Sequence, residues 1–336
     1  MITAWGCIGI YAAEDPSLAE RHELGSDRAV AAAVAQAKNS GSPGIVCASS
    51  GNAAASAAAY AARAGLPAIL VMPAHTPQGK LAASGAYGAI QLLIEGDYSE
   101  SFALAAELAH TAGLVNVTTT YVNPTAVKAL RSVAYDLYRQ VGGAPDVVIV
   151  PTSAGPLVHG VVNGFEELRN WGLVSTLPRV IAAQPEGCAP VARAWSAGTA
   201  EVSEWERVTT DISGLNDPLR GYAGDGSLTL ERLRTSGGAA IALPDELVHL
   251  ARSDLALRAG VYAEPAGAIG VAALEELRKQ GLLHSGERVV CLVTGAGFKQ
   301  PLVSSEKPLR ASSVQEALAH IEKLLAPRYR TERREH

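Results

Sequence analysis

The sequence predicts an α/β protein with two open sheets, parallel or mixed, and three observations favour this class. Short apolar runs of strand length alternate with alanine-rich segments of helical length through most of the 336 residues. The apolar runs contain few polar residues, as strands do when helices cover both faces of a parallel sheet. Hydrophobic residues make up 48% of the chain and charged residues 18%, which is enough apolar material for a sizeable buried core.

The first series of alternating segments is expected to form a smaller domain over residues 24–122. One alanine-rich segment stops at Gly65, a residue that commonly ends helices because it tolerates a positive φ. Short buried strands followed by helices of this length are typical of βαβ units and a parallel sheet. The expected strands span residues 44–48, 68–72, 90–94 and 114–118, and the expected helices span residues 52–64, 78–85 and 99–111.

A second series is expected to form a larger domain over residues 123–310, with residues 1–23 packed against it. The stretch 185–237 is rich in Gly, Ser and Thr and predicts irregular structure, of which residues 212–228 are expected to line a cleft. Residues 311–336 are expected to form an amphipathic helix, capped by Ser312 or Ser313, and a solvated basic tail. The remaining expected helices span residues 126–140, 160–169, 245–258 and 266–280, and the strands span residues 146–150, 179–184 and 289–294.

Charge and composition argue against several classes of protein. The chain has 28 Lys and Arg against 33 Asp and Glu, a net charge of −5, and only its far C-terminal tail is basic, so nucleic acid is not the expected partner. It contains no apolar run long enough to span a membrane and no convincing signal peptide. Cys7, Cys47, Cys188 and Cys291 are scattered, so we expect free thiols in a reducing cytoplasm and no metal site.

Ligands of open α/β sheets bind beyond the carboxyl ends of strands, where loops lead into helix N-termini. The first junction of this kind is Ala48–Ala53. Ser49, Ser50 and the backbone N–H groups that follow could hold a carboxylate or phosphate at the positive end of a helix. Asn52 could donate to a phenolic or carbonyl oxygen. Capping of the helix by the same side chains is the alternative interpretation.

Two further junctions have the same form. Residues 151–156, Pro-Thr-Ser-Ala-Gly-Pro, make a loop of small side chains that lets an anion approach the backbone, although an ordinary connection would look the same. Residues 293–298 place Thr294 at a strand end, with two glycines after it. A single Gly-x-Gly is weak evidence for a dinucleotide site, and no Gly-x-Gly-x-x-Gly follows the first strand, so a Rossmann dehydrogenase is disfavoured.

With these three junctions in this order, the sequence resembles the threonine synthase branch of the fold type II pyridoxal phosphate (PLP) enzymes, in the tryptophan synthase β superfamily. The resemblance extends from about Leu24 to Pro301, and its most specific part is residues 46–65, with Cys-Ala-Ser-Ser-Gly-Asn near its start. Further matches are Gly79-Lys80-Leu81, Tyr87-Gly88-Ala89, Tyr121-Val122-Asn123-Pro124, Glu264-Pro265-Ala266, Gly286-Glu287-Arg288-Val289-Val290 and Thr294-Gly295.

The resemblance implies PLP as cofactor and an amino-acid-like small molecule as substrate, and it is compatible with a homodimer. By this analogy Asn52 would face the ring oxygen of PLP, and Thr294 would hydrogen-bond the ring nitrogen. The loop that contains Ser153 and Gly155 would hold the cofactor phosphate. The substrate carboxylate would meet Ser49, Ser50 and Gly51.

The sequence departs from the family where the cofactor is attached. The family motif Ser-Phe-Lys-Asp-Arg-Gly, whose lysine forms the Schiff base with PLP, corresponds here to Leu24-Gly25-Ser26-Asp27-Arg28-Ala29. The hydroxyl of Ser26 cannot form an imine, and it cannot serve as the amine base that moves a substrate proton. The phosphate loop of the family, Gly-x-Gly-Gly, corresponds to Ser153-Ala154-Gly155-Pro156, in which Pro156 removes one backbone donor.

These departures leave several mechanisms open. PLP binds without a covalent link, or the pocket has abandoned PLP for another small anionic molecule. Lys128 is a candidate replacement amine, with a solvated helix lysine as the alternative, whereas Lys80 is interpreted as structural or substrate-facing. If PLP is lost, Asp27 or Tyr222 could act as general acid or base, although an ion pair of Asp27 with Arg28 is the simpler interpretation.

The leading functional hypothesis is a divergent threonine synthase-like enzyme of the lyase or transferase type, acting by elimination or replacement. A true PLP-dependent enzyme that uses another lysine, such as Lys128, is one alternative. A non-catalytic pseudoenzyme that binds a metabolite is the other.

Overall fold

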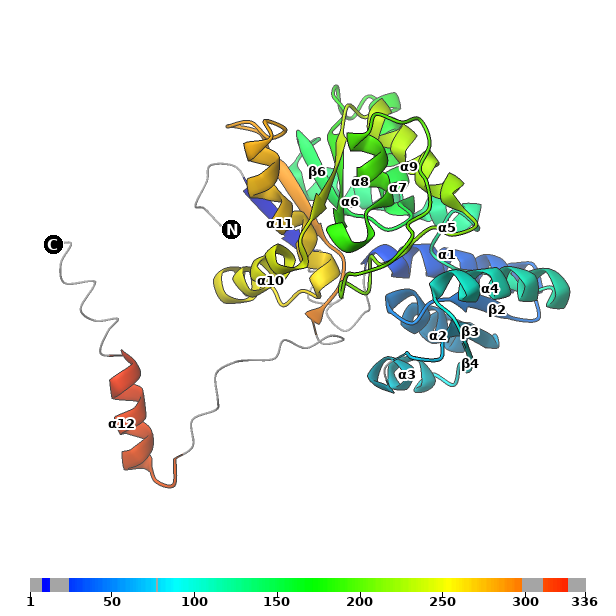
Figure 1. Cartoon of the computed structure of the whole chain (residues 1–336), viewed down its shortest axis with the longest axis horizontal. Helices are drawn as coiled ribbons and strands as arrows, with labels where there is room; N and C mark the ends of the chain where they lie inside the picture. The colour runs from blue at the N-terminus through cyan, green and yellow to red at the C-terminus, as the bar shows by residue number, and fades with distance from the viewer. Residues whose placement is uncertain (1–7, 13–23, 77, 298–310, 326–336) are drawn as a thin grey trace. The chain divides into compact units, whose positions relative to one another are not determined.

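Nine strands among the described residues form two parallel sheets, which confirms the predicted α/β class (Figure 1). The computed structural model describes residues 8–12, 24–76, 78–297 and 311–325. The first three ranges belong to one unit of the chain, and residues 311–325 belong to a second. Both sheets and every candidate ligand loop lie in the first unit, so the site is formed there.

The smaller sheet has four strands in the order β4-β3-β2-β5. Side chains of β2 alternate between its two faces: Ile45 and Cys47 pack with α1 and α2, whereas Val46 and Ala48 pack with α4. Burial on both faces explains why these strands are almost continuously apolar. The elements of this part are α1 (Leu24–Asn39), β2 (Ile45–Ala48), α2 (Asn52–Ala64), β3 (Ala68–Pro73), α3 (Gln78–Gly85), β4 (Ile90–Ile94), α4 (Tyr98–Ala112) and β5 (Val115–Asn116).

The larger sheet has five strands in the order β1-β9-β6-β7-β8. Its two faces have separate cores, one formed with α6, α7, α8 and α9, and the other with α10 and α11. Figure 1 shows α7, α8 and α9 grouped together and α10 beside α11. The strands are β1 (Ile8–Ala12), β6 (Val147–Pro151), β7 (Arg179–Pro185), β8 (Ala239–Leu243) and β9 (Val289–Val293), and the long helices are α7 (Pro156–Asn170), α10 (Asp245–Ala259) and α11 (Pro265–Lys279).

The predicted helix over residues 126–140 is instead two helices, α5 (Pro124–Ala129) and α6 (Ser132–Val141). Between them, Leu130 N bonds to Val127 O at 3.2 Å, a three-residue step that an α-helix does not use. Gly160 of α7 lies directly against this break, since a Cβ on Gly160 would stand 2.4 Å from Cβ of Leu130. The break therefore coincides with the closest approach of α7.

The stretch 185–237, expected to be irregular, contains two α-helices, α8 (Pro190–Ser196) and α9 (Ala223–Thr235), and a short 3-10 helix (Glu186–Cys188). The first is stabilised by a cap from outside its own sequence: Oε1 of Gln184, on β7, accepts from the backbone N–H groups of Val191 and Ala192. Helix α9 buries Leu230 and Leu233 in the core that it shares with α7 and α8 on one face of the larger sheet. Tertiary contacts, which sequence composition does not show, stabilise both helices.

The second unit contains α12 (Val314–Leu325), which begins directly after Ser313. Its cap is as expected, because the Ser313 hydroxyl accepts from the backbone N–H of Glu316 at 3.2 Å. The predicted basic tail and Cys7 lie outside the described residues, and the other three cysteines are free and buried. No helix in the described ranges combines the length and apolar character needed to cross a membrane.

Candidate functional site

A cavity of about 700 Å³ lies at the carboxyl ends of strands from both sheets. Ala48 and Pro73, the last residues of β2 and β3, line it from the smaller sheet. Pro151, the last residue of β6, and Thr294, which follows β9, line it from the larger sheet. This is the place where ligands of open α/β sheets are expected to bind.

The N-terminus of α2 forms one wall of the cavity. Ser49, Ser50, Gly51 and Asn52 all line it. Ser49 Oγ accepts from the backbone N–H of Gly51 at 3.1 Å, which shapes the loop. Gly51 is the N-cap of α2 and makes no side-chain capping bond, so the alternative interpretation of this junction as an ordinary side-chain cap is not supported. The positive end of α2 therefore faces the cavity.

The N-terminus of α7 forms the opposite wall, where Ser153, Gly155 and Pro156 line the cavity. Gly155 has φ 102°, and a Cβ on it would stand 2.1 Å from Oγ1 of Thr229, so a glycine is required there. Thr229 also donates to the carbonyl of Ala154 at 2.6 Å and fixes the loop to α9. The result is a rigid, small-residue loop at the positive end of a helix, although Pro156 contributes no N–H.

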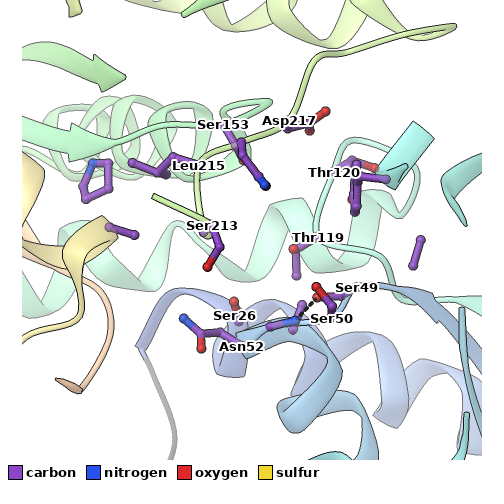
Figure 2. Close-up of a pocket in the computed structure, with 18 of the residues that line it drawn as sticks. Ser26, Ser49, Ser50, Asn52, Thr119, Thr120, Ser153, Ser213, Leu215 and Asp217 are labelled. Atoms are coloured by element: carbon purple, nitrogen blue, oxygen red, sulfur yellow. Dashed lines mark hydrogen bonds between the residues drawn. The ribbon is translucent and has the colours of Figure 1, made fainter. Parts of the chain in front are cut away.

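Figure 2 shows how the labelled side chains divide between the two walls. Ser26, Ser49, Ser50 and Asn52 lie on the side of the smaller sheet, and Ser153, Ser213, Leu215 and Asp217 lie across the cavity from them. Residues 213–218 and 220 line the cavity, so the stretch 212–228 contributes to it as expected.

Asn52 is connected to the larger sheet through Glu264, the residue before α11. Asn52 Nδ2 donates to Glu264 Oε1 at 2.7 Å, and Glu264 is only 7% exposed. Gly295 makes room for this carboxylate, because a Cβ at position 295 would stand 2.2 Å from Glu264 Oε1. Glu264 N also donates to Gly295 O at 2.9 Å, which holds Glu264 beside Gly295.

Ser26 lies in the first turn of α1 and lines the cavity, but its neighbour Asp27 does not. Asp27 is buried and accepts a hydrogen bond from Ser56 Oγ, on α2, at 2.5 Å. Arg28 donates to Ser132 and forms an ion pair with Asp136. These contacts connect α1 to α2 and α6, so the structure gives Asp27 a position between helices rather than one at the cavity.

The structure does not bring Lys128 to the site. Ala126 and Val127 of α5, and Leu130 directly after it, line the cavity, whereas the side chain of Lys128 is exposed on another face of the helix. The reason is the helical period, which turns a residue next to a buried one by about 100°. Apart from Asp27, Lys128 and Tyr222, every candidate site residue that the sequence predicts lines the cavity.

A lysine does reach the cavity, but from α3. Lys80 Nζ donates to Oγ of Ser213 at 2.9 Å, and both residues line the cavity. Burial lowers the pKa of Lys80 below its ordinary value, and the negative charge of Glu264 partly opposes this shift. The sequence predicts Lys80 to be structural or substrate-facing, and no local pattern indicates that its amine contacts Ser213.

Asp217 was also missed, because only its place in an irregular stretch pointed to the cleft. It lines the cavity, and its Oδ1 accepts from the hydroxyl of Tyr222 at 2.5 Å and from Leu219 N at 3.0 Å. Burial raises the pKa of Asp217 to about 6 despite these two hydrogen bonds. Tyr222 is therefore a partner of Asp217 and does not itself line the cavity.

Comparison with known proteins connects this geometry to a family. A family model described as pyridoxal-phosphate dependent enzyme matches residues 25–295. The threonine synthase of Methanocaldococcus jannaschii is 29% identical over 89% of this chain and 74% of its own. The threonine synthase of Halalkalibacterium halodurans is 33% identical over 82% of this chain and 74% of its own.

Solved structures with the same fold include maize serine racemase, with a TM-score of 0.71 and 22% identity over 92% of this chain and 86% of that one. A fungal L-serine ammonia-lyase from Rhizomucor miehei gives a TM-score of 0.68 and 20% identity over 81% of this chain and 84% of that one. At this level of identity the structures establish the fold alone.

Proposed function

The chain belongs to the family of pyridoxal-phosphate dependent enzymes, and from this premise we propose that it acts on an amino-acid-like or anionic small molecule by elimination or replacement. It is threonine synthase-like in sequence and has the fold type II architecture. The finer proposal is that this enzyme is divergent: its cofactor, where it uses one, is not attached at residue 26.

The observation that carries the proposal is a single cavity between two helix N-termini. The start of α2 supplies Ser49, Ser50 and Gly51, and the start of α7 supplies Ser153 and Gly155. Each helix N-terminus attracts an anion through its free N–H groups and its partial positive charge. A pocket with two such sites suits a pair of ligands or a single ligand that carries two anionic groups, such as a phosphate and a carboxylate.

The residues present fit pyridoxal phosphate. The rigid loop at Gly155 would hold the phosphate, Asn52 would meet the ring oxygen, and Thr294 would meet the ring nitrogen. Their common place around one cavity supports this assignment. When bound, the cofactor supplies an electron-withdrawing ring that stabilises negative charge on a substrate carbon.

The chain's own residues supply binding and proton transfer. Ser49, Ser50 and the N-terminus of α2 would orient the substrate carboxylate. Asp217, with its pKa raised to about 6, can be protonated or ionised in nearly neutral solution and is suited to give or take a proton. Ser26 offers a hydroxyl, so it can hydrogen-bond a ligand but cannot form an imine.

The test combines binding with turnover. Equilibrium dialysis measures the affinity of the full chain for pyridoxal phosphate, and product analysis follows O-phosphohomoserine, O-acetylserine and threonine, which carry different leaving groups. We expect saturable binding of the cofactor and turnover of at least one of these compounds. If the chain binds the cofactor saturably but neither turns over these compounds nor exchanges their carbon-bound protons in heavy water, a metabolite-binding pseudoenzyme is favoured.

A gain-of-function variant tests the role of residue 26. We expect Ser26→Lys to attach pyridoxal phosphate covalently at residue 26, because the rest of the pocket is retained. Reduction by borohydride would convert this link into a stable secondary amine. If the variant binds the cofactor but never joins it through residue 26, Ser26 does not occupy the attachment position and the proposed divergence is wrong.

A further inference from the structure

We propose that Lys80 is the reactive amine of this pocket and that it attaches an aldehyde-bearing anionic ligand, such as pyridoxal phosphate, which residue 26 cannot attach. This inference rests on the proposed function, because it assumes that the cavity receives such a ligand. It names a residue on a different helix from the expected attachment position, since Lys80 lies on α3 and Ser26 on α1.

Position is the first argument. Lys80 lines the same cavity as Ser26, Asn52 and Thr294. Its Nζ donates to Ser213 Oγ at 2.9 Å, so the long side chain is held across the cavity by a residue of the larger part of the fold. Glu264, which interacts electrostatically with Lys80, accepts from Asn52 at 2.7 Å. The Lys80 amine and the Asn52 amide therefore both interact with the same carboxylate, the first through its charge and the second through a hydrogen bond.

Protonation is the second argument. An amine attacks a carbonyl carbon only when its lone pair is free, and burial of Lys80 favours this neutral form. The hydrogen bond to Ser213 uses an N–H of the amine and leaves the lone pair available. The nearby carboxylate of Glu264 opposes the shift, so the amine remains able to take up a proton during a reaction.

Three other lysines are poorly placed for this role. Lys38 donates to the carbonyl of Ala64, Lys279 pairs with Glu275 and Glu276 on the exposed face of α11, and Lys128 is exposed on α5. Within the part of the chain that the structure describes, Lys80 is the lysine that lines the cavity.

The chemical step needs no additional reactant. The neutral Nζ of Lys80 adds to the aldehyde carbon of the ligand, and a C–N bond forms. One amine proton moves to the former aldehyde oxygen and makes it a hydroxyl group, and the second amine proton is transferred to this hydroxyl as the C–O bond breaks, which releases water and leaves a C=N bond. Borohydride then adds hydride to this bond and converts the link into a stable secondary amine that mass spectrometry detects.

The experiment maps that link on the full chain. The protein is incubated with pyridoxal phosphate at neutral pH, treated with borohydride and digested, and the mass added to each lysine-containing peptide is measured. We expect the label on Lys80 to saturate with ligand concentration and to exceed that on Lys128 and Lys38. Lys80→Arg, which keeps the positive charge and the long stem, is expected to lose the label. The matched control Lys128→Arg is expected to keep the label on Lys80.

The outcomes separate this inference from the proposed function. Saturable binding in equilibrium dialysis with no preferred label on Lys80 would overturn the inference and leave the proposed function standing. Absence of both binding and label would overturn the inference and the use of this cofactor together. A label that spreads over exposed lysines, or that persists unchanged in total amount in Lys80→Arg, would also overturn it.

Discussion

Asn52 on α2 donates its side-chain amide to Oε1 of Glu264 at 2.7 Å, and this bond joins two parts of the chain that are 212 residues apart in sequence. One partner follows a strand of the smaller sheet, and the other precedes a helix packed on the larger sheet. Because both residues line the cavity, the bond is at once a structural connection and part of the candidate site.

Removal of this bond is expected to destabilise the fold. In Asn52→Ala the buried carboxylate of Glu264 loses a donor, and hydrogen bonds to charged groups contribute about 1.5 to 3 kcal/mol. Urea unfolding at neutral pH measures the change in free energy of unfolding. Lys128→Ala, on an exposed position of α5, is the control and is expected to change stability by less than about 0.5 kcal/mol. Equal stability of Asn52→Ala and the wild type would mean that other groups satisfy Glu264 fully.

The loop before α7 is expected to reject any side chain at position 155. Gly155 has φ 102°, which strains a residue with a Cβ, and the Cβ added in Gly155→Ala would stand 2.1 Å from Thr229 Oγ1. Gly172→Ala is the matched control, because Gly172 also has a positive φ of 73° but nothing within 4 Å of its added Cβ. We expect about 1 to 2 kcal/mol of destabilisation in the control and about 1 to 3 kcal/mol more in Gly155→Ala. Urea unfolding of both variants decides this.

The same variant tests the anion site. Any Gly155→Ala protein that folds is expected to bind pyridoxal phosphate more weakly, since the loop must move to relieve the contact with Thr229. If Gly155→Ala and Gly172→Ala lose the same stability and the cofactor affinity is unchanged, then neither the fold nor cofactor binding depends on the close approach of this loop to α9.

Asp217 is expected to make stability depend on pH. Burial raises its pKa from 3.8 to about 6, so between these values the folded protein binds more protons than the unfolded chain. The stability contributed by the protonated carboxyl is therefore complete below about pH 4 and is lost as pH rises through about 6, a change of about 3 kcal/mol. Asp217→Asn keeps an acceptor for Tyr222 and removes the titration.

We therefore expect Asp217→Asn to gain stability relative to the wild type between about pH 4 and about pH 7 by up to about 3 kcal/mol. Urea unfolding at both pH values measures the difference. Asp254→Asn, which removes an exposed carboxylate of α10, is the control and is expected to show a much smaller change. A difference between Asp217→Asn and the wild type that does not vary with pH would show that Asp217 titrates normally.

The sequence by itself determined the fold class and the loops of the site. Alternating apolar strands and alanine-rich helices are local patterns, and the predicted bounds of α2, α3 and β4 agree with the structure. The loops at Ser49–Asn52 and Ser153–Gly155 were also identified, because polar and small residues between a strand and a helix mark the binding edge of a parallel sheet. The lack of an amine at residue 26 follows from the sequence alone.

Only the tertiary structure decided which side chains share the cavity. Lys80 and Ser213 are 133 residues apart in sequence, and no periodicity or motif relates such distant positions. The same limit explains the opposite result for Lys128, which follows a matching Asn-Pro pair but lies on the exposed face of α5. Local patterns specify helices and strands, whereas the packing of helices and strands that are far apart in the sequence decides which side chains share the cavity.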